Sequence, residues 1–169
     1  WGVLQRIGLC FAVVGLLALY GKARLQWIVI TLLLLGYWGL LLAGGSFEPW
    51  INLASRVDTA LLGPLLYQFD PATGLGHDPE GLLSTLPAIA TTLLGLRAGD
   101  WLRHGKTARL AGAGLIALML GLLWSHSFPL NKNLWTSSYV LVAAGWTMLA
   151  LAAAHVLVDR WQWPALGRR

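Results

Sequence analysis

Long apolar runs alternate with short polar segments along the whole 169-residue chain. A helix that crosses a bilayer needs about 20 mostly apolar residues, and five runs approach that length. The pattern therefore predicts an all-α, polytopic integral membrane protein with about five transmembrane helices, which together form one membrane domain. The predicted spans cover residues 3–21, 25–44, 82–102, 110–125 and 138–158.

The longest polar stretch, residues 45–81, has a different pattern in its first half. Apolar residues recur there at helical spacing, at Trp50, Ala54, Val57, Leu61 and Leu65. Polar residues lie largely opposite, at Asn52, Ser55, Arg56, Asp58 and Thr59. This spacing predicts an amphipathic helix that lies on the outer membrane surface and ends near Gly63 and Pro64. The remainder, residues 68–81, is rich in glycine, proline and aspartate, and we expect it to be irregular.

The composition excludes two classes of protein, and it argues against a nucleic-acid partner, a disulfide framework and a metal site. Hydrophobic residues make up 57% of the chain and charged residues only 11%, against roughly 25% charged residues in soluble domains. A soluble globule and a disordered chain are therefore both excluded. The net charge of +5 is spread thinly between apolar runs, so we expect no nucleic-acid partner. The single cysteine, Cys10, excludes a disulfide framework, and no two histidines have metal-ligand spacing, so we expect no metal site.

Lysine and arginine residues fall mainly on one side of the predicted spans, nine against three. The nine are Lys22, Arg24, Arg97, Arg103, Lys106, Arg109, Arg160, Arg168 and Arg169, and the three are Arg6, Arg56 and Lys132. Because cytoplasmic loops carry the basic excess, we expect the N-terminus outside and the C-terminus inside. Five tryptophans near span ends fit ordinary anchoring at the membrane interface, namely Trp27, Trp50, Trp101, Trp161 and Trp163.

The third predicted span, residues 82–102, is the most polar of the five. Small and polar residues form one stripe on it, at Ser84, Ala88, Thr91, Gly95 and Ala98. We expect this stripe to face other helices or a cavity, and we expect Pro87 to bend the helix. Gly95 and Gly99 have the spacing of a helix-packing motif. The segment 112–117 fits a dinucleotide-binding pattern, but it begins a membrane span, so we reject a nucleotide site.

Two polar segments precede spans on the predicted outer side. His77, Asp78 and Glu80 precede the third span, where Asp78 would suit an N-cap with Pro79 as the first helical residue. The alternative is a binding site, because capping does not explain two carboxylates and an imidazole together. The segment Asn131-Lys132-Asn133 precedes the fifth span and offers amide and ammonium donors suited to an anionic or carbonyl oxygen, or it is simply a polar loop.

Five further groups of residues complete the candidates. Thr136, Ser137 and Ser138 can cap the fifth span, and Gln5 and Arg6 lie on the same predicted side as the two polar segments. His126 lies at the outer end of the fourth span, and His104 lies in a basic turn. His155 lies late in the fifth span, one helical turn from Asp159.

Three segments, Gly2–Gly8, Asp78–Ala88 and Pro129–Tyr139, resemble the heparan-alpha-glucosaminide N-acetyltransferase family, in particular its bacterial NagX-like members. The resemblance implies a polytopic membrane acyltransferase that moves an acetyl group from acetyl-CoA across the membrane to an amino sugar or related glycan. It implies integral membrane localisation, in the bacterial inner (cytoplasmic) membrane, with the lipid bilayer and a glycan acceptor as partners. A homo-oligomer is an open expectation.

The resemblance also assigns expected roles to the outer residues. Asn131, Lys132 and Asn133 would polarise an oxygen, and Asp78 or Glu80 would hold the sugar or accept its proton. Gln5 and Arg6 would join the same lining, with His77, His126 and Trp135 as weaker candidates. The basic residues Arg97, Arg103, Lys106 and Arg109 would meet CoA phosphates if the donor enters from the cytoplasm, although the basic excess of cytoplasmic loops explains them equally well.

One part of the family pattern has no counterpart in this chain. The family's acetyl-accepting histidine lies upstream, in a His-Ala-x-Trp-like motif, and family chains continue through further helices beyond Trp163-Pro164. We therefore expect an interior piece of a longer protein, inactive by itself, with its catalytic histidine elsewhere. Two alternatives stay open: a sugar transporter or permease component, and a non-catalytic membrane scaffold.

Overall fold

The computed structural model describes residues 2–160, and most of these are helical. The long helices are α1 (Val3–Tyr20), α2 (Ala23–Ala43), α4 (Thr85–Arg103), α5 (Thr107–Trp124) and α6 (Ser137–His155). A shorter helix, α3 (Leu53–Leu62), leads through a 3₁₀ turn, η1 (Gly63–Leu65), into two strands, β1 (Gln68–Asp70) and β2 (Leu75–His77). A π-helical turn, η2 (Val156–Arg160), extends α6. The predicted anchors Trp161 and Trp163 and the predicted inner charges Arg168 and Arg169 lie outside the described residues.

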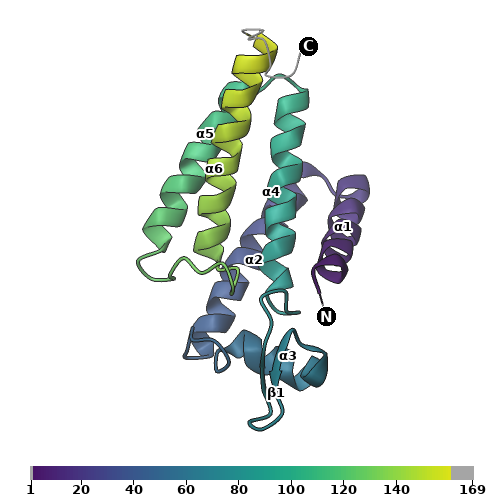
Figure 1. Cartoon of the computed structure of the whole chain (residues 1–169). Helices are drawn as coiled ribbons and strands as arrows, with labels where there is room; N and C mark the ends of the chain where they lie inside the picture. The colour runs from purple at the N-terminus through teal and green to yellow at the C-terminus, as the bar shows by residue number, and fades with distance from the viewer. Residues whose placement is uncertain (1, 161–169) are drawn as a thin grey trace, which may run out of the picture.

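Four of the five predicted spans have the length and composition needed to cross a membrane. They are α1, α2, α5 and the continuous helix Ser137–Asp159, and they make this an integral membrane protein. The remaining helix, α4, corresponds to the third predicted span. It is 19 residues long but carries Arg97, Asp100 and Arg103 near its end. It contacts α1, α2, α5 and α6, and Figure 1 shows it between them. The bundle therefore shields the most polar helix, while the number of spans stays a prediction.

The helices run up and down so that the predicted polar segments gather at one end of the bundle. Figure 1 shows the start of α1, all of α3, the hairpin and the starts of α4 and α6 at this end, which we call the α3 end. The turn between α4 and α5 lies at the opposite end. The two polar segments that precede α4 and α6 thus share one end, as the alternation of spans predicts. Which end faces outside stays a prediction.

The segment 68–81, expected to be irregular, in fact forms a small antiparallel hairpin. Gln68 pairs with His77 and Asp70 with Leu75. The hydroxyl of Thr59 on α3 accepts a hydrogen bond from the Gly76 N–H at 2.9 Å and donates to the Gly76 carbonyl at 3.2 Å. Strands of three residues are too short to show alternation in the sequence, so the prediction of irregular structure was wrong for this reason.

Helix α3 is amphipathic, as predicted, but its polar side faces inward. Asn52, Ser55 and Asp58 are at most 1% exposed, whereas Leu61 and Leu65 are 67% and 69% exposed. Buried polar side chains need hydrogen-bond partners, and these three find them in backbone groups or in a histidine. The exposed leucines suit a surface that meets lipid, where apolar groups carry no cost. The helix therefore presents apolar residues outward and holds the adjacent turn with polar ones.

Close helix packing occurs at glycines other than the predicted pair. Gly95 and Gly99 have open space around the position of a Cβ atom, so the predicted packing motif is not used within residues 2–160. Instead α5 and α6 approach each other at Gly114, Gly121 and Gly145. A Cβ atom on Gly145 would lie 2.7 Å from the Leu118 nitrogen and 2.8 Å from the Gly114 oxygen, which leaves no room for a side chain.

We expect Gly145→Ala to lower the free energy of unfolding of the purified protein by ~1–3 kcal/mol, because the new methyl group overpacks the α5–α6 contact. Gly112→Ala is the matched control, since nothing lies within 4 Å of its Cβ position. Thermal unfolding in detergent measures both. Equal melting temperatures for the two variants would contradict the packing described here.

Candidate functional site

Arg6, in the first turn of α1, lies at the centre of the polar groups at the α3 end. Its side chain is only 6% exposed although it carries a charge. Nη1 donates to the Pro79 carbonyl at 2.8 Å, and Nη2 donates to the Ser84 carbonyl at 3.0 Å. The guanidinium lies 4.3 Å from the centroid of the Trp135 ring. Arg6 thus joins α1, the turn before α4 and the loop before α6.

Trp135 connects the same network to α4. Its indole Nε1 donates to the Thr91 hydroxyl at 3.1 Å, and its ring meets Tyr139 edge-on at 5.6 Å between centroids. Its backbone φ is 52°, in the left-handed region that a bulky residue rarely adopts. Such strain persists only where surrounding contacts fix it, and it concentrates at functional sites. Sequence analysis treated Trp135 as a weaker candidate, whereas the structure places it centrally.

These residues line one cavity of about 390 Å³ between α1 and α4, which we call the Arg6 cavity. Its polar lining consists of Arg6, Glu80, Thr91, Thr92 and Trp135. Its apolar lining consists of Val3, Ile7, Cys10, Phe11 and Ala88. An apolar cavity with a few convergent polar groups is the usual form of a small-molecule site. Glu80 is the sole carboxylate among the described residues that line it.

The small, polar stripe of α4 lies on cavities, as predicted. Ala88 and Thr91 line the Arg6 cavity, and Thr91, Gly95 and Ala98 line a second hollow against α6. Pro87 gives no physical reason for the expected bend, because α4 begins at Thr85 and Pro87 lies in its first turn. A proline there removes no helical hydrogen bond.

Asp58, on α3, holds the turn that carries Glu80, and sequence analysis missed it. Its Oδ1 accepts hydrogen bonds from the Leu82 N–H at 2.9 Å and the Leu83 N–H at 3.3 Å. A side chain at Gly81 would collide with Asp58 Oδ2, so only glycine fits there. The amphipathic pattern had placed Asp58 on an exposed polar face. The one available signal was the glycine that directly follows Glu80.

Asp78 has a structural position rather than a place in the cavity. Its Oδ1 accepts from the Glu80 N–H at 2.9 Å, and its Oδ2 accepts from the Tyr67 N–H at 3.2 Å. The prediction that Asp78 caps the third span was wrong, because α4 begins at Thr85 and its N-cap residue is Ser84. The chain between them forms turns that the Asp58 and Asp78 carboxylates hold in place.

His77 is buried beside Asp78 and pairs with α3. The Ser55 Oγ lies 3.0 Å from His77 Nδ1, whereas Nε2 has no hydrogen-bond partner among the described residues. Burial lowers the pKa of the His77 imidazole, so the ring is neutral at physiological pH. His77 is 6% exposed and does not line the Arg6 cavity, and its observed contacts are those of a core histidine.

The Asn131-Lys132-Asn133 segment forms a turn near Trp135 but does not line the Arg6 cavity. Asn131 Oδ1 accepts from the Asn133 N–H at 2.9 Å and the Leu134 N–H at 3.1 Å. Lys132 and Asn133 are exposed. The two polar segments therefore meet through the Arg6 guanidinium and the Trp135 ring. Lys132 is in none of the ion pairs found among residues 2–160.

The predicted cap at the start of α6 also has a different use. Thr136 occupies the N-cap position, but its hydroxyl makes no cap hydrogen bond and donates instead to the Pro129 carbonyl at 3.0 Å. The Ser138 hydroxyl donates to the Phe128 carbonyl at 2.6 Å, and the Ser137 hydroxyl donates to the Leu34 carbonyl of α2 at 2.7 Å. All three hydroxyls fix the loop that presents Trp135.

The remaining candidates lie away from the cavity. Gln5 and His126 are exposed. His104 contacts the Asp100 carboxylate at 3.4 Å, and His155 contacts Asp159 at 2.7 Å, both one helical turn along the chain. Such exposed local pairs contribute little to stability. None of the described histidines lines the Arg6 cavity.

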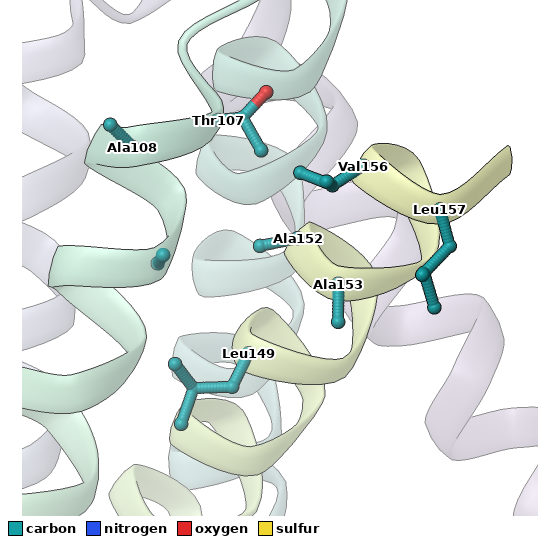
Figure 2. A pocket seen from close by; sticks show the side chains of 8 residues that line it. Thr107, Ala108, Leu149, Ala152, Ala153, Val156 and Leu157 are labelled. Atoms are coloured by element: carbon teal, nitrogen blue, oxygen red, sulfur yellow. The ribbon is translucent and has the colours of Figure 1, made fainter. Parts of the chain in front are cut away.

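A larger hollow of about 550 Å³ lies near the opposite end, between α5 and α6. Figure 2 shows its lining, which consists of Thr107 and aliphatic side chains such as Leu149 and Val156. It contains no ionisable group among the described residues, so it offers no acid, base or nucleophile. The Arg6 cavity is smaller, but it holds the charged groups and is the better candidate site.

The stability contributed by Asp58 should depend on pH. Burial raises the pKa of its carboxyl from 3.8 to about 6, and the two backbone hydrogen bonds offset this only in part. Because the folded pKa lies above the unfolded one, the contribution is present below about pH 4 and is lost as pH rises through about 6. We expect the melting-temperature difference, wild type minus Asp58→Asn, to fall between about pH 5 and about pH 7. A difference that is constant or grows over this range would refute the assignment.

Comparison with curated proteins gives three relatives. The chain is 30% identical to heparan-alpha-glucosaminide N-acetyltransferase of Homo sapiens over 217 residues, which covers 94% of this chain and 33% of that protein. It is 34% identical to the Mus musculus protein of the same name over 124 residues, covering 63% of this chain and 19% of that protein. The chain resembles the heparan-alpha-glucosaminide N-acetyltransferases. This confirms the resemblance seen in the three sequence segments.

The third relative is of a different kind, the cyanate transport protein CynX of Escherichia coli K12. It is 30% identical over 113 residues, covering 66% of this chain and 29% of that protein. No protein-family model matches the chain. The chain spans about a third or less of the length of each of these curated relatives.

Proposed function

We propose that this chain is part of a membrane-bound acyltransferase that moves an acetyl group from acetyl-CoA across the membrane to an amino sugar or related glycan. The observation that carries the proposal is the Arg6 cavity, whose lining includes a buried guanidinium and a carboxylate at one end of a helical bundle. The similarity to heparan-alpha-glucosaminide N-acetyltransferase over 94% of the chain supports it. The proposed location is the bacterial inner (cytoplasmic) membrane, with the Arg6 cavity on the outer side.

Acetyl transfer to an amine has two chemical needs that this cavity would meet. The amine nitrogen attacks the acetyl carbonyl carbon, so that a C–N bond forms and the bond from carbon to its carrier breaks. The amine must lose a proton, and the Glu80 carboxylate, which lines the cavity, would accept it. Negative charge develops on the carbonyl oxygen, which the Arg6 guanidinium would stabilise.

The exposed residues around the cavity would bind the rest of the acceptor. Lys132 and Asn133 lie on the same loop as Trp135 and offer donors to the hydroxyl or acidic groups of a glycan. At the opposite end, Arg103, Lys106 and Arg109 are exposed around the turn between α4 and α5. They would attract the phosphates of acetyl-CoA from the cytoplasm. The residue that carries the acetyl group between the two ends is proposed to lie outside this chain.

A second candidate function is transport of a small anion through the membrane. The specific observation in its favour is the similarity to the cyanate transport protein CynX over 66% of this chain. A buried arginine beside a cavity would also suit an anion pathway. The similarity that supports the acyltransferase proposal is more extensive, since the human acetyltransferase matches 94% of the chain.

One experiment separates the two functions. The full-length protein is reconstituted in sealed vesicles and supplied with radiolabelled acetyl-CoA and glucosamine, and in parallel with labelled cyanate. The acyltransferase proposal predicts labelled N-acetylglucosamine above a boiled control and no cyanate uptake above empty vesicles. Cyanate uptake without acetylated product would favour the transporter instead.

A further inference from the structure

We propose that Asp58 is a positioning residue for the Arg6 cavity, acting through the backbone of the turn between β2 and α4. This inference rests on the proposed function for its catalytic readout, but the geometry on which it stands is independent of any reaction. Asp58 does not line the cavity. It acts on two side chains that line the cavity, those of Glu80 and Arg6.

The first step of the argument is the hold of Asp58 on the turn. Its carboxylate is 1% exposed and accepts hydrogen bonds from two consecutive backbone N–H groups, those of Leu82 and Leu83. The missing side chain of Gly81 lets the carboxylate approach the backbone closely. Helix α3 and this turn are therefore locked together, although 24 residues separate Asp58 from Leu82 in the sequence.

The second step is what the locked turn does. The two carbonyls that accept from Arg6 belong to Pro79 and Ser84, which flank the residues held by Asp58. Glu80 lies between them and lines the cavity. A shift of this turn would therefore move the acceptor atoms that aim the Arg6 guanidinium, and it would move the carboxylate at the same time. The positions of Arg6 and Glu80 therefore both depend on the contact that Asp58 makes with the turn.

The third step concerns why a carboxylate serves here. Another residue of the same surface, Asn52, caps α3 with a neutral amide oxygen that accepts from the Ser55 N–H at 2.8 Å. A neutral acceptor is thus sufficient where only a helix end needs a partner. Asp58 Oδ1 accepts hydrogen bonds from two consecutive backbone N–H groups, whereas the Asn52 oxygen accepts from one, so the contact at Asp58 fixes more of the backbone. Such a contact suits a position that must be held accurately.

Cys10 provides a readout that needs no enzymatic activity. It is the only cysteine in the chain, and it lines the Arg6 cavity on α1. In the full-length protein, with any cysteine outside residues 1–169 replaced by serine, the rate of Cys10 modification by a methanethiosulfonate reagent reports the shape of the cavity. The kcat and KM for acetyl transfer are measured on the same variants before modification.

We expect Asp58→Ala and Gly81→Ala each to change the Cys10 modification rate by at least ~5-fold and to lower kcat by ~10-fold with a smaller change in KM, the effect of one lost hydrogen-bonded contact. Asp58→Asn keeps an acceptor oxygen and should stay within ~3-fold of the wild type. Gly99→Ala on α4 is the control, because its Cβ position is open.

The outcomes separate the two proposals. An unchanged Cys10 rate in folded Asp58→Ala and Gly81→Ala overturns the positioning role, whatever the activity. If Asp58→Ala does not fold, Gly81→Ala, which displaces the intact carboxylate, decides the question. A wild-type protein without acetyl transfer, but with the expected changes in Cys10 rate, overturns the proposed function and leaves the positioning role supported.

Discussion

Replacing Arg6 by alanine in the full-length protein is expected to lower acetyl transfer by at least ~100-fold, which corresponds to ~2.7 kcal/mol. The loss follows from three contacts that end together: two hydrogen bonds from the guanidinium to carbonyls and the stacking on the Trp135 ring. Hydrogen bonds that involve a charged group contribute ~1.5–3 kcal/mol each, so two of them are sufficient for the expected loss. Arg6→Lys keeps the charge but loses the planar fork, and we expect it to recover only a small part of the activity.

Arg56→Ala is the matched control, since Arg56 is an exposed arginine on the same end of the molecule. It should leave acetyl transfer within ~2-fold of the wild type, as surface substitutions usually do. Protein yield and melting temperature are measured for each variant to separate lost function from lost folding. An Arg6→Ala protein that folds and transfers acetyl groups at the wild-type rate would contradict the central position given to Arg6.

Glu80→Gln is expected to lower kcat by ~100-fold or more, because a general base contributes ~10²–10⁴-fold to such a reaction. The substitution keeps the size of the side chain and removes its capacity to accept a proton. The backbone N–H of Glu80, which donates to Asp78, is unaffected, so the turn should keep its shape. We therefore expect the melting temperature to change little while the rate falls.

Glu48→Gln serves as the control for Glu80→Gln, because Glu48 is an exposed carboxylate outside the cavity. The rate of Glu48→Gln should stay within ~2-fold of the wild type, as surface substitutions usually do. A Glu80→Gln protein with an unaltered rate would remove Glu80 from the chemistry.

Hydrophobic periodicity was enough to predict the five long helices and the short surface helix, because four of the long helices are apolar runs of membrane-spanning length and α4 is a more polar helix of 19 residues. It was also enough to place the two polar segments at one end, since the spans alternate in direction. It failed for β1 and β2, whose three-residue strands are held by Thr59 and not by their own pattern. It failed likewise for the start of α4, where side chains from elsewhere satisfy the turn before the helix.

The candidate site was predicted in part, for a physical reason that concerns burial. Arg6 and Glu80 were identified from residue type and position, and both line the cavity. Asp58 was missed because a rule based on soluble surfaces assigns polar residues of an amphipathic helix to water. In α3 the polar side is buried against a turn and the leucines are exposed, so the rule points the wrong way. Contacts between residues far apart in the sequence have no local signal, such as Arg6 with Pro79 across 73 residues and Trp135 with Thr91 across 44 residues.

The most direct test of the account uses sealed vesicles that contain the full-length protein, with labelled acetyl-CoA on one side and glucosamine on the other. The account predicts that labelled product forms when glucosamine is on the side of the Arg6 cavity and acetyl-CoA is on the side of the turn between α4 and α5. It also predicts that Glu80→Gln abolishes this product while Glu48→Gln does not. Product formed only in the reversed arrangement, or equally well by Glu80→Gln, would contradict the assignment of the Arg6 cavity as the acceptor site.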